Sequence, residues 1–273
     1  MKESLPPVHI GPVLQGEMTS EFEKLQEVVQ QKEIHTIISA RGGGALLPCI
    51  LGALPVLYQH GVIGQEPWGM VGTSTGSIAT LCAKSIGLEP TIDWHWKLRP
   101  IAQFDGVVIP WFKHLTRSGM GRGAFRTLNF EEYYHTYLDP SVQADYPDNT
   151  RVNPYAKPSM TGVVVTRKEG LEPYIYHDKH WEDEEGNFDV RQMIQCVERS
   201  CSLPRIFSST QDPHVGSIVD GGYNRYHLAS PAKLAHKLLG QEGDRVISIE
   251  PAANDLEPGI DISWENEVQI VRI

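Results

Sequence analysis

The alternation of strand-like and helix-like segments in the N-terminal third of the chain constrains the fold most. Residues 33–40 (EIHTIISA) are rich in β-branched side chains and predict a strand. Apolar residues at helical spacing follow over 45–60, where Pro55 should kink the helix. Residues 68–72 predict a second strand and the small residues of 77–86 a second helix. Because strand–helix units of this kind place strands side by side in parallel, we predict an α/β fold.

Further segments of the second half extend this sheet. The helix-like residues 190–199 interrupt a series of strand-like segments. Strands are predicted at 160–166, 172–177, 217–220, 245–250 and 268–273, the first two as a neighbouring pair.

One domain over residues 1–273 is the expected organisation, because a chain of this length with 40% hydrophobic residues can bury one full-sized core. Residues 1–32 are predicted to form an N-terminal arm ending in a short helix over 20–32. The aromatic, irregular stretch 90–160 is predicted to be a lid or insertion over a pocket, with a helix at 130–137.

Charge and composition exclude several function classes. The formal net charge of −10 argues against nucleic acid as a partner, since phosphate binding needs a basic surface. The four cysteines form no C-x-x-C pair, so zinc is not indicated and a reducing compartment fits. The first residues have no signal-peptide pattern, and the longest apolar stretch, 45–58, is too short to span a bilayer. We therefore expect a cytoplasmic protein with peripheral membrane contact.

The segment Gly72-Thr73-Ser74-Thr75-Gly76 follows a predicted strand and precedes a predicted helix, which is the setting of a nucleophile elbow. In such a turn the serine hydroxyl stands clear of the sheet, and the flanking glycines allow helix and strand to pack closely. The helix N-terminus favours the negative charge that develops there. Ser74 is thus the candidate nucleophile, although G-x-S-x-G also arises by chance in a glycine-rich chain.

A second motif, Gly42-Gly43-Gly44, joins a predicted strand to a predicted helix. Without Cβ atoms, backbone N–H groups in such a loop can converge on one point, as in an oxyanion hole or a phosphate cradle. An ordinary strand–helix turn is the alternative. Neither G-x-x-x-x-G-K-[ST] nor G-x-G-x-x-G is present here, so nucleotide binding is not indicated.

A third motif, Asp220-Gly221-Gly222, ends the apolar segment GSIVDGG. An aspartate held at a strand tip by a glycine turn is well placed to act as a base. A simple D-G turn is the alternative interpretation.

The order of these motifs resembles that of the patatin-like phospholipase family. In that family a glycine-rich oxyanion loop precedes the serine elbow by about one strand–helix unit, and a later D-G-G supplies the partner carboxylate. Residues 52–62 (GALPVLYQHGV) resemble the helix after the family's loop, and 200–204 (SCSLP) its serine-rich segment before D-G-G. The resemblance is close over 34–89 and fair over 191–223.

This resemblance implies a three-layer α/β/α fold with a mostly parallel central sheet, and a Ser–Asp dyad. Asp220 would accept the proton of Ser74, directly or through water, while Ser74 attacks an ester carbonyl. The substrate would be an acyl lipid, and neither metal nor cofactor would be needed. The implied oxyanion-hole residues are Gly42, Gly43, Gly44 and Ala45, and the implied elbow glycines are Gly72 and Gly76.

Two alternatives to this dyad stay open. Leu46 and Leu47 occupy positions where the family usually has Arg-Gly, which admits a catalytically inactive binding or scaffold protein. Arg41, just before the loop, is a candidate substitute for that arginine. A conventional α/β-hydrolase would instead use a histidine after the acidic residue, and His227 and His236 stand in that order. The resemblance implies that neither histidine is catalytic.

Overall fold

The computed structural model describes most of the expected sheet and the helices beside it. Its described residues are 36–43, 47–59, 63, 68–85, 87, 104–105, 127–128, 157–204, 207, 209–224, 245–250, 261–265 and 268–272. The arm predicted over 1–32 and the helix predicted over 130–137 lie outside them. Within 90–156, the described residues are the short paired strands β3 (Phe104–Asp105) and β4 (Thr127–Leu128).

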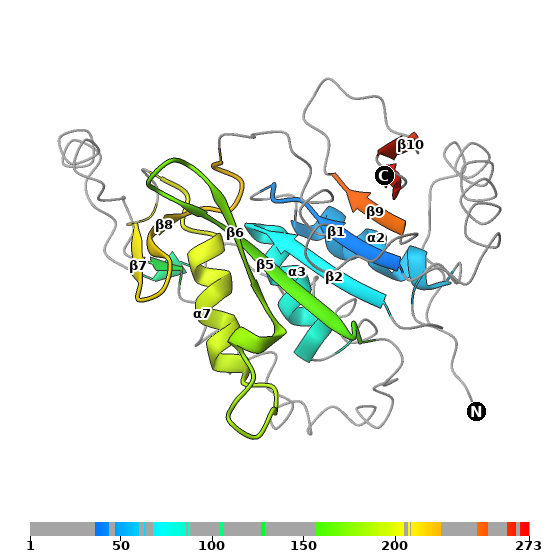
Figure 1. Cartoon of the computed structure of the whole chain (residues 1–273). Helices are drawn as coiled ribbons and strands as arrows, with labels where there is room; N and C mark the ends of the chain where they lie inside the picture. Colours follow the sequence, from blue (N-terminus) through cyan, green and yellow to red (C-terminus); the bar gives the residue numbers. More distant parts are fainter. Residues whose placement is uncertain are drawn as a thin grey trace.

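A nine-stranded sheet forms the centre of the molecule, in the order β10-β11-β9-β1-β2-β5-β8-β7, with β6 also paired to β5 (Figure 1). Its strands are β1 (Thr36–Ala40), β2 (Trp68–Thr73), β5 (Met160–Arg167), β6 (Pro173–His177), β7 (Thr210–Asp212), β8 (Gly216–Val219), β9 (Arg245–Ile249), β10 (Asp261–Glu265) and β11 (Val268–Arg272).

The sheet is mixed. Its central strands run parallel, as predicted for a mostly parallel sheet, and antiparallel strands are added toward both edges. Strands β11, β9, β1, β2 and β5 run parallel. The pairs β10–β11, β5–β6, β5–β8 and β7–β8 are antiparallel. Short connections join β5 to β6, β7 to β8 and β10 to β11, whereas β8 reaches β5 from far along the chain. Strand β5 returns as β6 through a tight turn in which Gly170 and Leu171 have φ values of 74° and 52°. The predicted α/β class and the neighbouring pair β5–β6 are confirmed.

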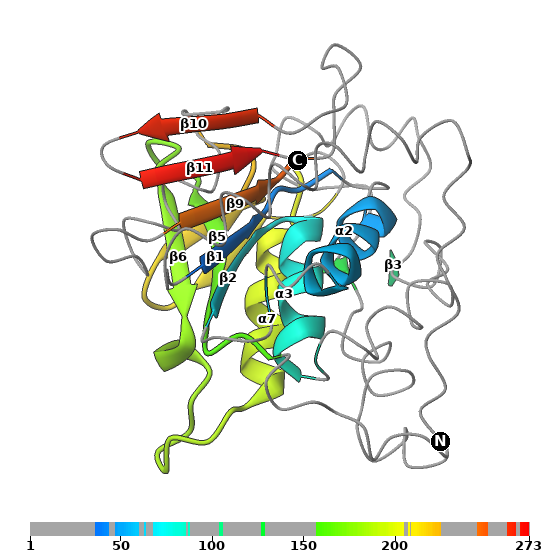
Figure 2. The ribbon, with the colours of Figure 1, turned by 90° about the vertical axis from the view of Figure 1, so that its right-hand side faces the viewer.

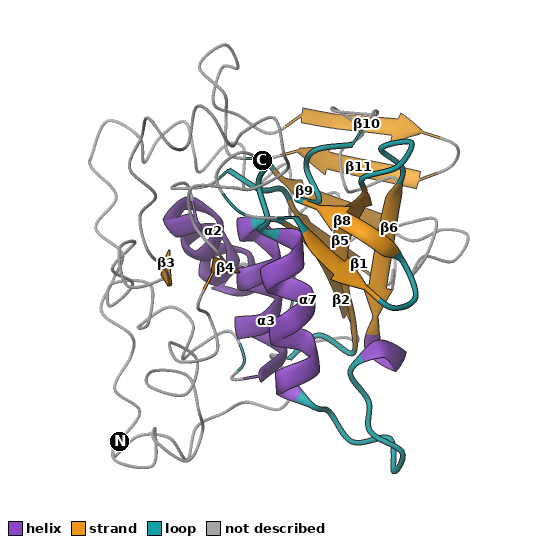
Figure 3. Ribbon diagram, turned by 90° about the vertical axis from the view of Figure 1, so that its left-hand side faces the viewer, coloured by secondary structure: helices purple, strands orange, loops and turns teal. Residues whose placement is uncertain are grey.

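Three of the described helices pack against one face of this sheet (Figures 2 and 3). They are α2 (Leu47–Gln59), which includes Pro55 without a break, α3 (Thr75–Ser85) and α7 (Val190–Ser200). Helix α3 lies between the other two and contacts both. Of the three layers expected, the described residues form two, the sheet and this helical layer. None of the described helices is long and apolar enough to span a bilayer.

Strand β1 is buried on both sides, which explains its continuous apolar run. Ile38 and Ala40 belong to the core cluster formed with the helices, whereas Ile37 and Ser39 point to the other face, since side chains alternate along a strand. All four are 0% exposed. A central parallel strand without polar alternation is the pattern expected for burial on both faces.

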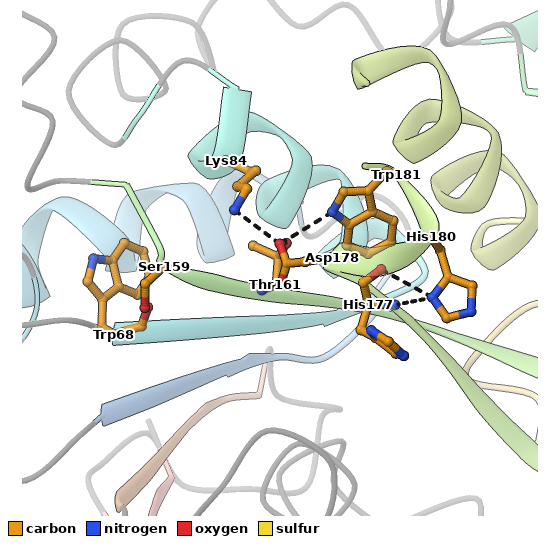
Figure 4. Close-up of polar contacts among 8 residues, drawn as sticks. All are labelled: Trp68, Lys84, Ser159, Thr161, His177, Asp178, His180 and Trp181. Atoms are coloured by element: carbon orange, nitrogen blue, oxygen red, sulfur yellow. Dashed lines mark hydrogen bonds and ion pairs between the residues drawn. The ribbon is translucent and has the colours of Figure 1, made fainter. Parts of the chain in front are cut away.

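At the end of the sheet where β5 begins, Asp178 joins three elements (Figure 4). Its carboxylate accepts hydrogen bonds from the backbone N–H and the hydroxyl of Thr161, both at 2.7 Å. It also forms an ion pair with Lys84 near the end of α3, at 3.0 Å, and accepts from the indole of the buried Trp181 at 3.4 Å. Asp178 begins the short 3-10 helix η7 (Asp178–His180), so it ties η7, β5 and α3 together.

Removing this carboxylate should destabilise the fold. We expect Asp178→Ala to lower the free energy of unfolding by about 2–3 kcal/mol, because the N–H and the hydroxyl of the buried Thr161 both lose their hydrogen bonds to this carboxylate. The matched control is Asp189→Ala, which removes the N-cap of α7 at an exposed site and should cost about 1 kcal/mol. Urea unfolding of both variants tests this; equal losses would contradict the role given to Asp178.

Candidate active site

Ser74 occupies the sharp turn between β2 and α3. Its φ is 53°, a left-handed conformation that is unfavourable for a residue with a side chain. A Cβ on Gly72 would overlap the carbonyl of Gly76, and one on Gly76 would overlap the carbonyl of Ala40. The two glycines of the motif are therefore required by the close approach of strand and helix at this turn.

The structure brings Ser74 and Asp220 into direct contact. The hydroxyl of Ser74 donates a hydrogen bond to Oδ2 of Asp220 at 2.7 Å, although 146 positions separate them in the sequence. The backbone N–H of Gly222 donates to Oδ1 at 2.8 Å. The D-G-G turn thus orients the carboxylate, with one oxygen held by the turn and the other directed at the serine.

Strand β5 brings these two segments together. On one side Val164 pairs with Thr73, the last residue of β2. On the other side β8 pairs with β5 only as far as Val219. Gly221 then packs so closely on Val164 that a Cβ there would overlap the carbonyl oxygen of Val164. The ends of β2 and β8 therefore meet across one strand.

Burial sets the acidity of the candidate base. Asp220 is only 4% exposed. Loss of hydration raises its pKa from 3.8 to about 6, and the hydrogen bonds from Ser74 and Gly222 limit the rise because they stabilise the carboxylate. At neutral pH the group is largely ionised and close to its pKa, which suits a residue that accepts and then returns a proton.

The glycine loop lies against the serine. A Cβ on Gly42 would come within 2.6 Å of the Cβ of Ser74 and 3.3 Å of its hydroxyl oxygen. The N–H of Gly43 donates to the Thr75 hydroxyl at 3.0 Å, so one of the predicted oxyanion donors already has a partner. Gly44 and Ala45 lie outside the described residues.

Arg41, the candidate substitute for the family's loop arginine, contacts the neighbouring strand. Its backbone N–H donates to the carbonyl of Ile249 at 3.1 Å. Its guanidinium forms an ion pair with Glu250 at 3.6 Å. These contacts anchor the start of the loop to the end of β9.

The end of α7 and the residues after it contribute contacts to which the sequence reasoning assigned no role. The hydroxyl of Ser200 accepts a hydrogen bond from the N–H of Ser74 at 2.8 Å and donates to the carbonyl of Val164. The carbonyls of Ser200 and Ser202 accept from the N–H groups of Gly221 and Asp220, each at 3.0 Å. The SCSLP pattern marked this segment, but only folding shows what its serines contact.

The histidines proposed for a triad, His227 and His236, lie outside the described residues. Among the histidines that are described, His180 contacts Tyr174 and His177 in a cluster beside β6. Burial, together with the neighbouring His177, lowers the pKa of His180.

Comparisons with known proteins give distant structural likenesses. No model of a known protein family matches the chain, and no curated protein matches it. VipD from Legionella pneumophila is similar at a TM-score of 0.49 with 14% identity, over 83% of this chain and 51% of that one. ExoU, from the ExoU–SpcU complex of the Pseudomonas aeruginosa type III secretion system, is similar at 0.30 with 15% identity, over 60% of this chain and 36% of that one. The chain thus spans about half the length of VipD.

Replacing the buried carboxylate should stabilise the protein in a pH-dependent way. The raised pKa means that the folded state favours protonated Asp220, so this group contributes stability below pH 3.8 that is lost as pH rises through about 6. Asp220→Asn removes the cost of the buried charge. We expect it to raise the free energy of unfolding by about 1–3 kcal/mol at pH 8 and by much less at pH 4.

Denaturant unfolding of wild type and Asp220→Asn at the two pH values measures this difference. If Asp220→Asn raises the free energy of unfolding equally at both pH values, or lowers it at pH 8, the carboxyl is not held in an environment that disfavours its charge.

Proposed function

We propose that this chain is a lipid acyl hydrolase of the patatin-like type, working through a dyad of Ser74 and Asp220. The observation that carries the proposal is the 2.7 Å hydrogen bond from Ser74, on its strained elbow, to the buried Asp220. A serine hydroxyl becomes an effective nucleophile when an adjacent base takes its proton.

The reaction runs through an acyl-enzyme. Asp220 takes the hydroxyl proton as Ser74 attacks the carbonyl carbon, giving a tetrahedral oxyanion. The ester C–O bond then breaks, and Asp220 returns the proton to the leaving alcohol. A water molecule next gives its proton to Asp220 and attacks the acyl-enzyme; the acid leaves as the proton returns to Ser74.

The glycine loop and the start of α3 would stabilise the oxyanion. Gly42 lies beside the Ser74 hydroxyl, and the N–H of Gly43 donates a hydrogen bond to the hydroxyl of Thr75, the residue after Ser74. We propose that the substrate oxygen replaces the Thr75 hydroxyl as the acceptor of this N–H, with Gly44 and Ala45 as further donors. The N-terminus of α3 adds a favourable dipole at the same place.

A dyad fits this geometry better than a histidine-containing triad. In a triad the carboxylate accepts a hydrogen bond from the imidazole, and the imidazole accepts one from the serine hydroxyl. Here the carboxylate of Asp220 accepts directly from Ser74, and its other oxygen accepts from Gly222. A histidine would have to separate the two residues that the fold brings into contact.

An acyl lipid is the proposed substrate class, with peripheral membrane contact. Apart from the motif resemblance, two exposed apolar side chains next to residues that contact Asp220 support it. Leu203 is 40% exposed and Tyr223 is 43% exposed. They follow Ser202 and Gly222 directly, the residues whose backbones contact Asp220. Exposed apolar side chains next to the residues that hold the base suit a substrate with a long acyl chain.

A fluorophosphonate probe tests the proposed nucleophile. We expect wild type to be phosphonylated at Ser74 with loss of fluoride, as read by mass spectrometry of the labelled peptide. Ser74→Ala should not label at this peptide, and Asp220→Asn should label at least about 10²-fold more slowly, because the general base is gone.

His227→Ala and His236→Ala are the controls, and they should label at nearly the wild-type rate. Loss of labelling in a folded histidine variant would replace the dyad with a triad. A folded wild type that does not label, with or without lipid vesicles, would favour an inactive binding protein.

The pH dependence of turnover should report Asp220. We expect kcat/KM for a soluble short-chain ester to rise with a slope of one on a logarithmic plot up to about pH 6 and then level, because only ionised Asp220 accepts the proton. Steady-state rates between pH 4.5 and 8 measure this. A value of kcat/KM that stays level down to pH 4.5 would contradict the role of a buried carboxylate as the base.

A further inference from the structure

Ser200 connects the nucleophile to the strand beneath it. It is the last residue of α7 and is 0% exposed. Its hydroxyl oxygen accepts from the N–H of Ser74 at 2.8 Å, and its proton goes to the carbonyl of Val164. The hydroxyl thus both accepts and donates a hydrogen bond, and both partners are backbone groups at the site.

The hydroxyl stands where a backbone ladder would otherwise continue. Thr73 of β2 is paired in parallel with Val164 of β5. In a continued ladder the next N–H of β2, that of Ser74, would be able to donate directly to the carbonyl of Val164. Ser200 lies between these two groups instead. The inserted hydroxyl lets the chain leave the sheet at Ser74 while its N–H and the carbonyl both remain paired.

The same residue also contacts the turn that carries the base. Its backbone carbonyl accepts from the N–H of Gly221 at 3.0 Å. The preceding residue, Arg199, forms an ion pair with the buried Asp212 at 2.7 Å, which holds the end of α7 against the β7–β8 hairpin. Ser200 therefore accepts hydrogen bonds both from Ser74 and from Gly221, the residue after Asp220.

We propose that Ser200 is a positioning residue that keeps the Ser74 hydroxyl in line with the Asp220 carboxylate; this rests on the proposed function. Without its hydroxyl, the Ser74 N–H and the Val164 carbonyl lose their shared partner, and the strained elbow can relax toward the strand. That shift moves the serine away from its base. It also follows that the N–H of Ser74 is occupied and does not serve the oxyanion.

Ser200→Ala tests this role against a matched control, Ser202→Ala. Ser202 lies in the same segment and is 5% exposed, but its hydroxyl donates only to the carbonyl of Glu198 within α7. We expect Ser200→Ala to lower kcat for a p-nitrophenyl ester and the rate of fluorophosphonate labelling at least about tenfold, with KM changed less than about twofold. Ser202→Ala should stay within about twofold of wild type in each quantity.

Hydrogen exchange at the Ser74 amide provides a readout that does not depend on activity. Loss of its acceptor should make this amide exchange at least about tenfold faster in Ser200→Ala than in wild type or Ser202→Ala. Ser200→Cys, which keeps the shape of the side chain with a slightly larger atom that is a weaker acceptor and donor, covers the case in which the alanine variant does not fold. It should fall between wild type and alanine in exchange and labelling.

Wild-type labelling or turnover in Ser200→Ala would overturn the positioning role, while the proposed function would stand. Unchanged exchange at the Ser74 amide would overturn it as well. If the Ser74 amide exchanges faster in Ser200→Ala but the wild type never labels, the proposed function falls, and the positioning role of Ser200 in catalysis falls with it.

Discussion

The arrangement of the site depends on the packing around the carbonyl of Val164 in β5. Thr73 pairs with Val164 from one side, and Gly221 packs on its carbonyl so closely that no side chain would fit. The Ser200 hydroxyl donates to the same oxygen. Three segments far apart in the sequence therefore meet at one peptide group. Because backbone positions in a packed sheet vary little, the geometry of Ser74 and Asp220 follows from this contact rather than from the two side chains alone.

The sequence predicted those parts of the fold whose signals are local. The β-branched runs of β1 and β9 and the elbow around Ser74 could be located because each depends on neighbouring residues. The three-residue, largely polar β7 was missed, since so short a strand forms only through its pairing with β8. The central parallel strands were predicted, but the antiparallel pairing of β8 with β5 was not, because the two strands lie far apart in the chain and no local pattern encodes their contact.

In the candidate site, too, the residues marked by local motifs could be predicted, whereas the contacts made by tertiary packing could not. Ser74, Asp220 and the glycines of the loop were marked by their motifs, and their order suggested one site. The contact of Ser200 with Ser74 spans 126 positions and depends on where α7 ends against β5. The hydrogen bond that Gly43 gives to Thr75 depends equally on tertiary packing. Such contacts have no periodicity or spacing from which they could be predicted.

The bond between Gly43 and Thr75 also bears on how binding energy would be distributed along the proposed reaction. A neutral ester oxygen that displaces the Thr75 hydroxyl exchanges one neutral hydrogen bond for another, so the ground state gains little. Once that oxygen carries negative charge, the same N–H makes a stronger, charge-assisted bond. In the proposed reaction this exchange would favour the transition state selectively, so it would raise turnover without tightening the binding of substrate or of an uncharged product.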